Sequence, residues 1–498
     1  MAQPRRTLDD RDVIVIGGGI TGLAAALVLS ARGARVTLLE RDPEPDSATA
    51  NDAFERWKRT GAPQVRHSHV FLGRLRNLLR DQHPDLLQAL LDAGAHELRA
   101  LEHPPAPLRG MAAEPGDEDL VSLGCRRTTF EWVLRGHILR RGNVTVVSNA
   151  VVESLIAAPG TPPVVSGVRV RIGEHAEERR AHLVIDASGR RSHAPEWLAA
   201  IGARPPYERL EQSGIVYYTR FYRLRPGASE PAPSEHPGAA DFNWVKYAVF
   251  PADDRTFSVT VAVPLAVPRL KVLAQAPAFD EMVRAIPGIA RWIVPEIAEP
   301  IGDPKHPVQA MGGLINRLRR FVDDVGPLAL RFFVLGDAAY CTNPLYGRGC
   351  AQGFMHAHFL AEALDAHPDD FSAAALALDQ RARAEIEPFY RASVLADRDS
   401  VRRAEGRAPR RFTGRLRERF FLDGIGLAVR CDPVVYRAFA RMMNMLDTPE
   451  RAFGRPEIMA RTLWVLAREK RYKALYGAPA PPDREATIAR CEAAVAAA

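Results

Sequence analysis

Cysteine is scarce in this 498-residue chain, and the few that occur follow no pattern. They stand at Cys125, Cys341, Cys350, Cys431 and Cys491. An odd number, wide spacing and the lack of Cys-x-x-Cys argue against a disulfide framework, a zinc site and an iron–sulfur cluster. We therefore predict a protein that binds no metal and works in a reducing compartment.

Long apolar runs and targeting signals are missing as well. No stretch of about 18 uncharged apolar residues occurs, so no transmembrane helix is expected. Residues 1–11 are short and polar, and the apolar run after them fits a first strand better than a signal-peptide core. The expected location is the cytoplasm.

The chain has no internal repeat of fixed period. Its formal net charge of +7 is spread over the whole length, and no DNA- or RNA-binding motif accompanies it, so a nucleic-acid partner is not expected. An apolar content of 47% indicates a globular protein, and the length allows two or three domains.

A glycine-rich segment near the N-terminus has the pattern of a dinucleotide-binding turn. Residues 12–16 are mostly Val and Ile, as in a strand buried on both faces of a parallel sheet. Gly17 allows the tight turn, Gly19 lets the backbone approach a pyrophosphate, and Gly22 lets the next helix pack on the sheet. That helix is expected over 20–32, with its N-terminal amides aimed at the phosphates.

A second buried strand, expected over 35–39, ends at Glu40. A carboxylate at this place accepts hydrogen bonds from ribose hydroxyls and disfavours a 2′-phosphate, so FAD or NAD is preferred to NADP here. We also assign Arg41 and Val152 to the cofactor site.

More than three hundred residues later a second glycine-rich segment appears. A strand ends at Gly336-Asp337, and residues 343–349 read Asn-Pro-Leu-Tyr-Gly-Arg-Gly. Gly347 and Gly349 open a helix expected over 349–364, whose positive end stabilises negative charge on a bound group. Together the two segments predict one long dinucleotide, held at its adenosine end by the first segment and at its ribityl–flavin end by the second.

The fold class is predicted as α/β with an inserted α+β part: a Rossmann-like FAD-binding domain, an inserted antiparallel-sheet substrate domain and a C-terminal helical region. The predicted boundaries are 1–204 and 311–400 for the two parts of the FAD-binding domain, 205–310 for the substrate domain and 401–498 for the helical region. The insertion is assigned from aromatic and β-branched runs at 215–224, 244–250 and 256–263. Residues 43–65 and 102–118 are expected as loops, and 71–92 as a helical stretch.

The pattern resembles the FAD-dependent monooxygenases of the aromatic-hydroxylase superfamily over about residues 12–400. Within it, the chain is similar to bacterial flavin epoxidases and hydroxylases of polyketide or isoprenoid substrates. Besides the two glycine-rich segments, the likeness rests on the Arg-His-x-His segment at 66–69, on Arg127 before a helix start, and on residues 186–192 with Asp186 and Gly189.

The resemblance implies a chemistry and a set of roles. Reduced FAD would react with O2 to form a C4a-hydroperoxide, which transfers one oxygen atom to a large apolar polyene, polyketide or isoprenoid. Asp337 would bind a ribityl hydroxyl, Arg127 would contact the FAD and Pro344 would hold the loop beside the flavin ring. No second Gly-x-Gly-x-x-Gly occurs, so NAD(P)H would donate electrons either directly and transiently or through a partner flavin reductase.

Two departures keep the substrate open. The chain has Asp186-Ala187-Ser188-Gly189 where the aromatic hydroxylases have Asp-Gly, and Tyr340 where they have His. The Trp-x-Trp-x-Ile-Pro segment of flavin halogenases is absent. The alternatives to a monooxygenase are an FAD-dependent reductase or dehydrogenase of isoprenoid-type substrates, and a flavoprotein that only relays electrons.

Candidate catalytic residues are Arg66, His67, His69 and Tyr346, although the first three also suit a polar loop. We expect Cys341 and Cys350 to be small buried residues rather than a covalent flavin link. The basic stretch 402–430 contains Phe412, Phe420 and Phe421, a composition that suits contact with an anionic membrane. The favoured interpretation is a solvated helix that covers a core.

Overall fold

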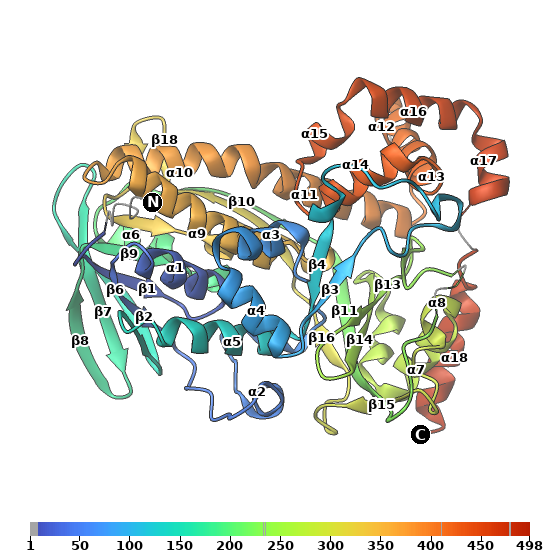
Figure 1. The fold of residues 1–498 in the computed structure, drawn as a ribbon, viewed down its shortest axis with the longest axis horizontal. Coiled ribbons are helices and arrows are strands. Elements are labelled where there is room, and N and C mark those ends of the chain that lie inside the picture. Colours follow the sequence, from blue (N-terminus) through green and yellow to red (C-terminus); the bar gives the residue numbers. More distant parts are fainter. Residues whose placement is uncertain (1–7, 233, 235, 410, 478–479) are drawn as a thin grey trace.

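The computed structural model describes residues 8–232, 234, 236–409, 411–477 and 480–498 (Figure 1). Its centre is a five-stranded parallel sheet in the order β20-β9-β1-β2-β5. The five strands are β1 (Asp12–Ile16), β2 (Arg35–Leu39), β5 (Val144–Val147), β9 (Leu183–Asp186) and β20 (Phe332–Val334). The sheet therefore joins both glycine-rich segments, because β1 and β20 flank β9 on its two sides.

Helices α1 (Ile20–Ser30) and α5 (Arg127–Leu139) pack on strands of this sheet, and α9 (Arg348–Ala366) packs on α1. α1 packs against both α5 and α9. Nearly every residue of α1 is buried, which fits a helix between a sheet and a second helix layer. The expected α/β class is confirmed.

The remaining strands form antiparallel sheets. One has six strands: β11 (Ile215–Leu224), β12 (Ala239–Asp241), β13 (Lys246–Pro251), β14 (Thr256–Pro264), β15 (Ala298–Ile301) and β16 (Gln309–Met311). Two have three strands each, namely β6 (Ala150–Ala158), β7 (Val164–Ile172) and β8 (His175–Arg180), and β10 (Tyr207–Gln212), β17 (Ile315–Arg320) and β21 (Tyr340–Cys341). Two-stranded pairs are β3 (His96–Arg99) with β4 (Val121–Gly124), and β18 (Val322–Asp323) with β19 (Gly326–Pro327).

The other helices that begin before residue 400 are α2 (Ala50–Arg56), α3 (Gly73–Gln82), α4 (Pro84–Asp92), α6 (Ala194–Ala200), α7 (Ala276–Arg284), α8 (Pro287–Ala290), α10 (Phe371–Glu385) and α11 (Glu387–Ala404).

Two local expectations were wrong. The stretch 71–92 is two helices, because Pro84 lacks an N–H and keeps His83 out of the helical conformation. The expected loop 43–65 contains α2, which a capping box between Thr49 and Asp52 starts.

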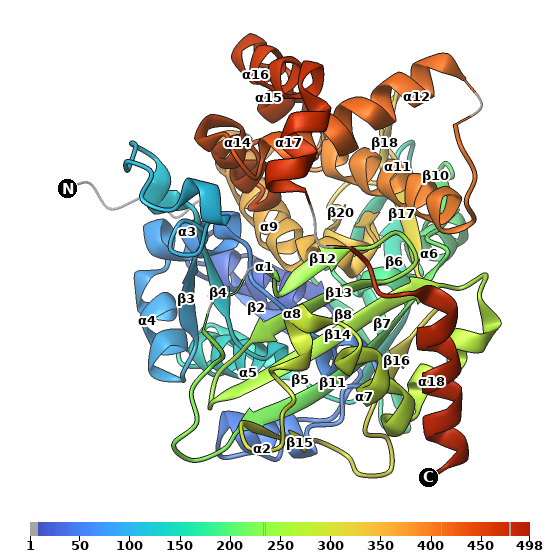
Figure 2. The ribbon, with the colours of Figure 1, turned by 90° about the vertical axis from the view of Figure 1, so that its right-hand side faces the viewer.

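The residues after 404 lie in two places. Helices α12 (Phe412–Arg419), α13 (Gly426–Ala428), α14 (Pro433–Met443), α15 (Pro449–Phe453), α16 (Pro456–Ala467) and α17 (Glu469–Tyr476), with a π-helical segment at Phe420–Ile425, form one group. Helix α18 (Arg484–Ala496) leaves that group and packs on α7 beside the six-stranded sheet (Figures 1 and 2). Its Ile488 and Cys491 are buried in the core of that sheet. The domain boundary at residue 401 stays a prediction.

Candidate functional site

A cavity of about 480 Å³ opens between the two glycine-rich segments, and we call it the glycine cavity. Its walls come from the β1–α1 turn, the end of β2, residues 59–69, the turn after β9, residues 310–315 and the segment before α9. Segments from more than three hundred residues apart in the chain thus face one another across a single space. Its volume lies within the range usual for ligand pockets.

The first glycine turn has the geometry of a backbone cradle. Gly17 has φ +100°, and a Cβ there would lie 2.7 Å from the Ala187 carbonyl oxygen. A Cβ at Gly19, in contrast, would meet only the Arg127 guanidinium, at 4.0 Å, so Gly19 turns its open side to the cavity. Gly22 does not line the cavity; a Cβ there would overlap the Gly17 carbonyl oxygen, so Gly22 serves the packing of α1 on its own turn.

The second segment supplies a carboxylate without a partner. Asp337 lines the cavity, and its carboxylate accepts no hydrogen bond from the residues that the structure describes. Burial raises the pKa of Asp337, while the positive charges of Arg190, Arg127 and Arg317 oppose the rise. A free acceptor at this place suits a hydroxyl-bearing ligand.

The loop between Asp337 and α9 brings a left-handed residue to the cavity. Gly347 has φ +65°, and its Cα hydrogens face Val70. Pro344, Gly347 and Gly349 all line the glycine cavity, whereas Tyr346 and Arg348 do not. The N-terminus of α9 therefore lies at the cavity wall, where its free amides favour negative charge.

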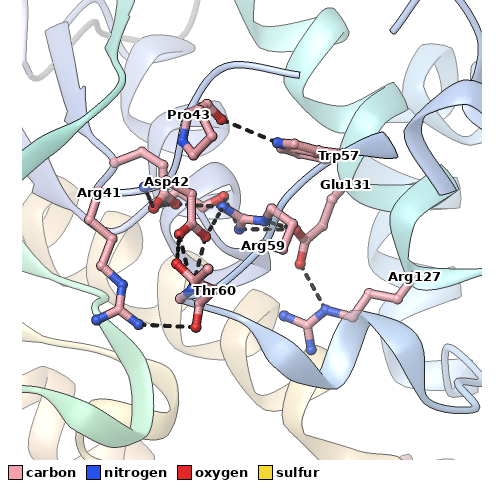
Figure 3. A network of polar contacts seen from close by, with 11 residues as sticks. Arg41, Asp42, Pro43, Trp57, Arg59, Thr60, Arg127 and Glu131 are labelled. Atoms are coloured by element: carbon pink, nitrogen blue, oxygen red, sulfur yellow. Dashed lines mark hydrogen bonds and ion pairs between the residues drawn. The ribbon is translucent and has the colours of Figure 1, made fainter. Parts of the chain in front are cut away.

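A cluster of buried charges forms the wall next to the first glycine turn (Figure 3). Arg59 is 1% exposed in its side chain and forms ion pairs with Glu40 at 2.9 Å, Asp42 at 3.1 Å and Glu131 at 3.1 Å. The same guanidinium donates to the Gly18 carbonyl and lies over the Trp57 ring. Three carboxylates and the ring compensate the burial of one charge.

Glu40, a member of this cluster, has few free acceptor positions left for a ligand. Its carboxylate already accepts from the backbone amides of Gly18 at 2.8 Å and Asp42 at 2.9 Å. Glu40 still lines the cavity beside Arg41. The predicted contact with a ribose stays a prediction, and only the lone pairs that these partners leave can serve it.

Arg127 is buried, as expected of a cofactor contact rather than of surface charge. Its Nε donates to Glu131 at 2.7 Å, which turns the rest of the guanidinium toward the cavity. Glu131 is fully buried and bridges Arg127 and Arg59 (Figure 3). Arg126 is also buried but pairs with Asp253, away from the cavity lining.

The two histidines of the Arg-His-x-His segment both line the cavity. His69 donates its Nδ1 hydrogen to the His67 carbonyl at 2.9 Å, so its Nε2 is the acceptor that faces Arg127 Nη1 at 3.4 Å. Burial, and then the charge of Arg127, lowers the pKa of His69 to about 3; burial and Arg190 lower that of His67 to about 4. Both rings are neutral at physiological pH.

The other catalytic candidates lie elsewhere. Arg66 is outside the lining and stacks over the Phe54 ring at 5.0 Å. Tyr346 faces a second, larger cavity on the other side of residues 344–349. The structure does not bring these two together with His67 and His69.

Of the remaining predicted cofactor residues, Val152 and Gly189 line the cavity and Asp186 does not. Asp186 is fully buried and accepts from Ser188 N and Oγ and from Ser192 Oγ, so it shapes the turn after β9. The strand end points its carboxylate back into its own turn, and the expected direct contact with a cofactor stays a prediction.

Sequence reasoning missed Arg59 and Asp397. Arg59 stands in a Pro-rich stretch without a motif, and no local signal marks it. Asp397 of α11 accepts from Asn316 at 2.6 Å and from Asn343 at 2.7 Å, and so anchors the residue before Pro344. Burial raises the pKa of Asp397 to about 6.

Within the described residues, no group of three or more His, Cys, Asp or Glu side chains is placed to hold a metal ion. No helix in that part of the chain has the length and apolar character needed to cross a membrane.

Comparison with known proteins agrees with this geometry. The family model described as FAD dependent oxidoreductase matches residues 12–103. The chain is 29% identical to Protein Rv3254 of Mycobacterium tuberculosis, over 87% of this chain and 90% of that protein. It is 25% identical to kynurenine 3-monooxygenase of Salinispora arenicola, over 74% of this chain and 76% of that enzyme.

Among solved structures, the myxobacterial chondrochloren halogenase CndH superposes with a TM-score of 0.60 at 19% identity, covering 92% of this chain and 97% of that one. At this identity the likeness establishes the fold. Together, the family model and the relatives support an FAD-dependent oxidoreductase, in a chain that has the fold of flavin-dependent monooxygenases and halogenases.

Proposed function

We propose that the enzyme binds FAD in the glycine cavity and inserts one oxygen atom from O2 into a large apolar substrate, by epoxidation or hydroxylation. The observation that carries the proposal is the meeting of the two glycine-rich segments across one cavity of about 480 Å³. A dinucleotide with a flavin at one end needs a backbone cradle for its pyrophosphate and a hydroxyl acceptor for its ribityl chain. Gly19 and Asp337 offer these two features within the one cavity.

The residues that would hold FAD follow from their places. Gly17 and Gly19 would admit the pyrophosphate, and the N-terminus of α1 would face it. Glu40, Arg41 and Val152 lie where the adenosine end would rest. The flavin end of FAD, which would face the substrate, would lie against the second glycine-rich segment.

At that other end, Asp337 would accept a ribityl hydroxyl hydrogen. Gly347 and Gly349 would let the α9 N-terminus approach the flavin pyrimidine ring, and Pro344 would hold the loop beside it. Arg127, held by Glu131, would contact the cofactor with its free guanidinium nitrogens. Gly22 and Asp186 would act by shaping the two turns.

Bound FAD would supply the redox chemistry, activating O2 once it has been reduced. The chain's task is then to orient the substrate, exclude water and keep charges fixed. His67 and His69 stay neutral in their buried places and add no positive charge beside the flavin. No general acid or base is required of them.

Electrons would come from NAD(P)H, either directly or through a partner flavin reductase. The test uses purified protein with NAD(P)H, a flavin reductase where needed, a candidate polyene and labelled oxygen gas. The label should enter the product from the gas and not from water. Product formed at full rate without oxygen would overturn the proposal and favour an FAD-dependent reductase or dehydrogenase of isoprenoid-type substrates.

A further inference from the structure

A second and much larger cavity lies on the far side of residues 344–349. We call it the chamber; its volume is about 2050 Å³. Its walls come from loops 102–109 and 236–242 on one side and from α11, the π-helical segment, α14 and the end of α17 on the other. Figure 2 shows these C-terminal helices standing over β12 and β13. Pockets for drug-sized ligands have volumes of roughly 300–1,000 Å³, so the chamber has room for a considerably larger molecule.

The chamber and the glycine cavity share a wall. Along the strip 344–349, Pro344, Gly347 and Gly349 line the glycine cavity, while Tyr346 and Arg348 line the chamber. A ligand that contacts Arg348 therefore lies one residue away from the segment proposed to hold the flavin.

The chamber is apolar over much of its surface, with Phe242, Phe439, Met442 and Phe453 among its lining residues. Five carboxylates also line it, and each has a cationic partner in the described chain. They are Glu102, Asp241, Asp399, Glu418 and Glu450. No negative charge of the lining is left without compensation.

The arginines of the lining are not balanced in the same way. Six line the chamber, and three of them, Arg109, Arg348 and Arg430, have no carboxylate partner among the residues that the structure describes. Arg348 stands out because only 4% of it is exposed. Its guanidinium bonds to Ser393 Oγ at 2.9 Å and the Phe389 carbonyl at 3.3 Å, and its Nε has no acceptor.

Burial lowers the pKa of Arg348 to about 10, and the group remains charged at physiological pH. The rings of Tyr346 and Phe389 lie against it at 4.6 and 5.2 Å, which offsets part of the desolvation. A buried guanidinium is costly, and Asp397, although close enough to favour its charge, forms no ion pair with it. An anionic group of a ligand would therefore complete the site.

We infer that the chamber binds a large, extended apolar molecule that carries one anionic group, and that Arg348 pairs with that group. The inference rests on the proposed function, since it names the substrate class of the same enzyme. An apolar chain or ring system would lie against the aromatic and methionine side chains, and a carboxylate would lie at the wall next to the flavin segment. Arg430, which is partly buried, would add a second positive charge along the chamber.

The test compares two polyenes that share one carbon skeleton, retinoic acid and retinol, by equilibrium dialysis against the FAD-loaded protein. Retinoic acid should bind at least tenfold more tightly than retinol. Arg348→Gln should lose about tenfold in affinity for the acid and less than twofold for the alcohol. The flavin absorption band near 450 nm should shift when the acid binds to the wild type.

The matched control is Arg391→Gln. Arg391 also lines the chamber, but it already pairs with Glu387 and Glu450, so both ligands should bind to that variant within twofold of wild type. Equal binding of acid and alcohol by the wild type would overturn the inference, whatever the folding of Arg348→Gln. So would a folded Arg348→Gln that keeps the full preference.

FAD content, measured on the same preparations, separates the two proposals. A protein that carries FAD but shows no preference for the acid refutes the chamber ligand alone. A protein without FAD that still prefers the acid refutes the flavin site alone.

Discussion

The glycine cavity and the chamber lie on two sides of one six-residue strip and are built in opposite ways. The walls of the glycine cavity include two glycine-rich turns: Gly17, Gly18, Gly19, Gly347 and Gly349 all contribute. The walls of the chamber are side chains from helices and loops that no motif connects. A backbone cradle suits a ligand that is always the same, whereas a side-chain lining can suit one particular substrate.

The two cavities also differ in their charges. Among the buried arginines that line the two cavities, Arg59 and Arg127 at the glycine cavity are balanced by carboxylates of the chain itself. In the chamber, Arg348 has none among the described residues. The first arrangement stabilises a wall, and the second leaves a charge for a ligand to neutralise.

The largest expected effect breaks the glycine cavity. Gly19→Val should fold and yet retain no FAD, because its side chain would project into the open space where the pyrophosphate is proposed to lie. Flavin absorbance per chain after gel filtration measures this. The control is Gly136→Ala in α5, where an added Cβ would cause no clash. This variant should retain FAD like wild type. A folded Gly19→Val with full FAD content would contradict the assignment.

The next effect concerns the wall rather than the ligand. Glu131→Gln should lower the free energy of unfolding by about 3–5 kcal/mol, because it leaves two buried guanidiniums short of a counter-charge. Chemical denaturation measures it. Glu44→Gln removes the exposed partner of Arg135 and should cost about 1 kcal/mol or less. Equal losses in the two variants would show that the buried cluster is not a special stabiliser.

A core substitution in α16 tests whether the helices around the chamber can be destabilised without a change in the glycine cavity. Ile458 is buried in a small cluster with Leu427, Val435 and Val465, separate from the core of the parallel sheet. Ile458→Ala should cost about 2–5 kcal/mol locally. Hydrogen exchange should rise in residues 412–476 while FAD content stays at the wild-type level. Loss of FAD would mean that the two cavities depend on each other more than their separate cores imply.

A smaller effect is expected at the hydroxyl acceptor. Asp337→Ala should weaken FAD binding ten- to hundredfold, or roughly 1.5–3 kcal/mol, without unfolding the protein. FAD titration of the apoprotein, with thermal unfolding alongside, measures both quantities. Asp337→Asn keeps an acceptor oxygen and should lose less than Asp337→Ala. Unchanged affinity in both would make the Gly336-Asp337 segment a strand end and nothing more.

The smallest expected effect is a pH dependence. Since burial lowers the pKa of His67 to about 4, the unfolded chain takes up the proton first as the pH falls below about 6.5. The contribution of His67 to stability is therefore present above pH 6.5 and is lost as the pH falls toward 4, by about 2 kcal/mol at pH 5. His67→Gln should remove this part of the slope, measured by denaturation at pH 8 and pH 5. An identical slope in variant and wild type would show that His67 is solvated.

Much of the glycine cavity was predictable because its signals are local. Strand β1, the turn at Gly17 and helix α1 follow from residues that are neighbours in the chain, and the strand expected over 35–39 has the bounds that the structure gives to β2. Helix α9 starts at Arg348, one residue before the expected position. Turn chemistry and hydrophobic period act over a few residues, so one sequence is enough to find them.

The chamber was not predictable, nor were the partners of Arg59. Arg59 pairs with Glu40, Asp42 and Glu131, and only the folded chain places these carboxylates around it. Tyr346 was a catalytic candidate from its position in the motif, but it lines the chamber. Neighbouring residues of the strip 344–349 line different cavities, which the sequence does not indicate. Helix α18 returns to the six-stranded sheet, which a helical pattern alone does not indicate.

The sequence by itself determined the α/β class and the two segments that point to FAD, because glycine, buried-strand and helix-start signals are short-range properties of the chain. The tertiary structure decided which side chains lie together. It points the Asp186 carboxylate into its own turn, brings Asp397 to Asn343 before Pro344, and leaves Arg348 without an ion pair among the described residues of the chamber. Such pairings depend on the packing of residues far apart in the chain, where burial and charge act through distance in space rather than position in the sequence.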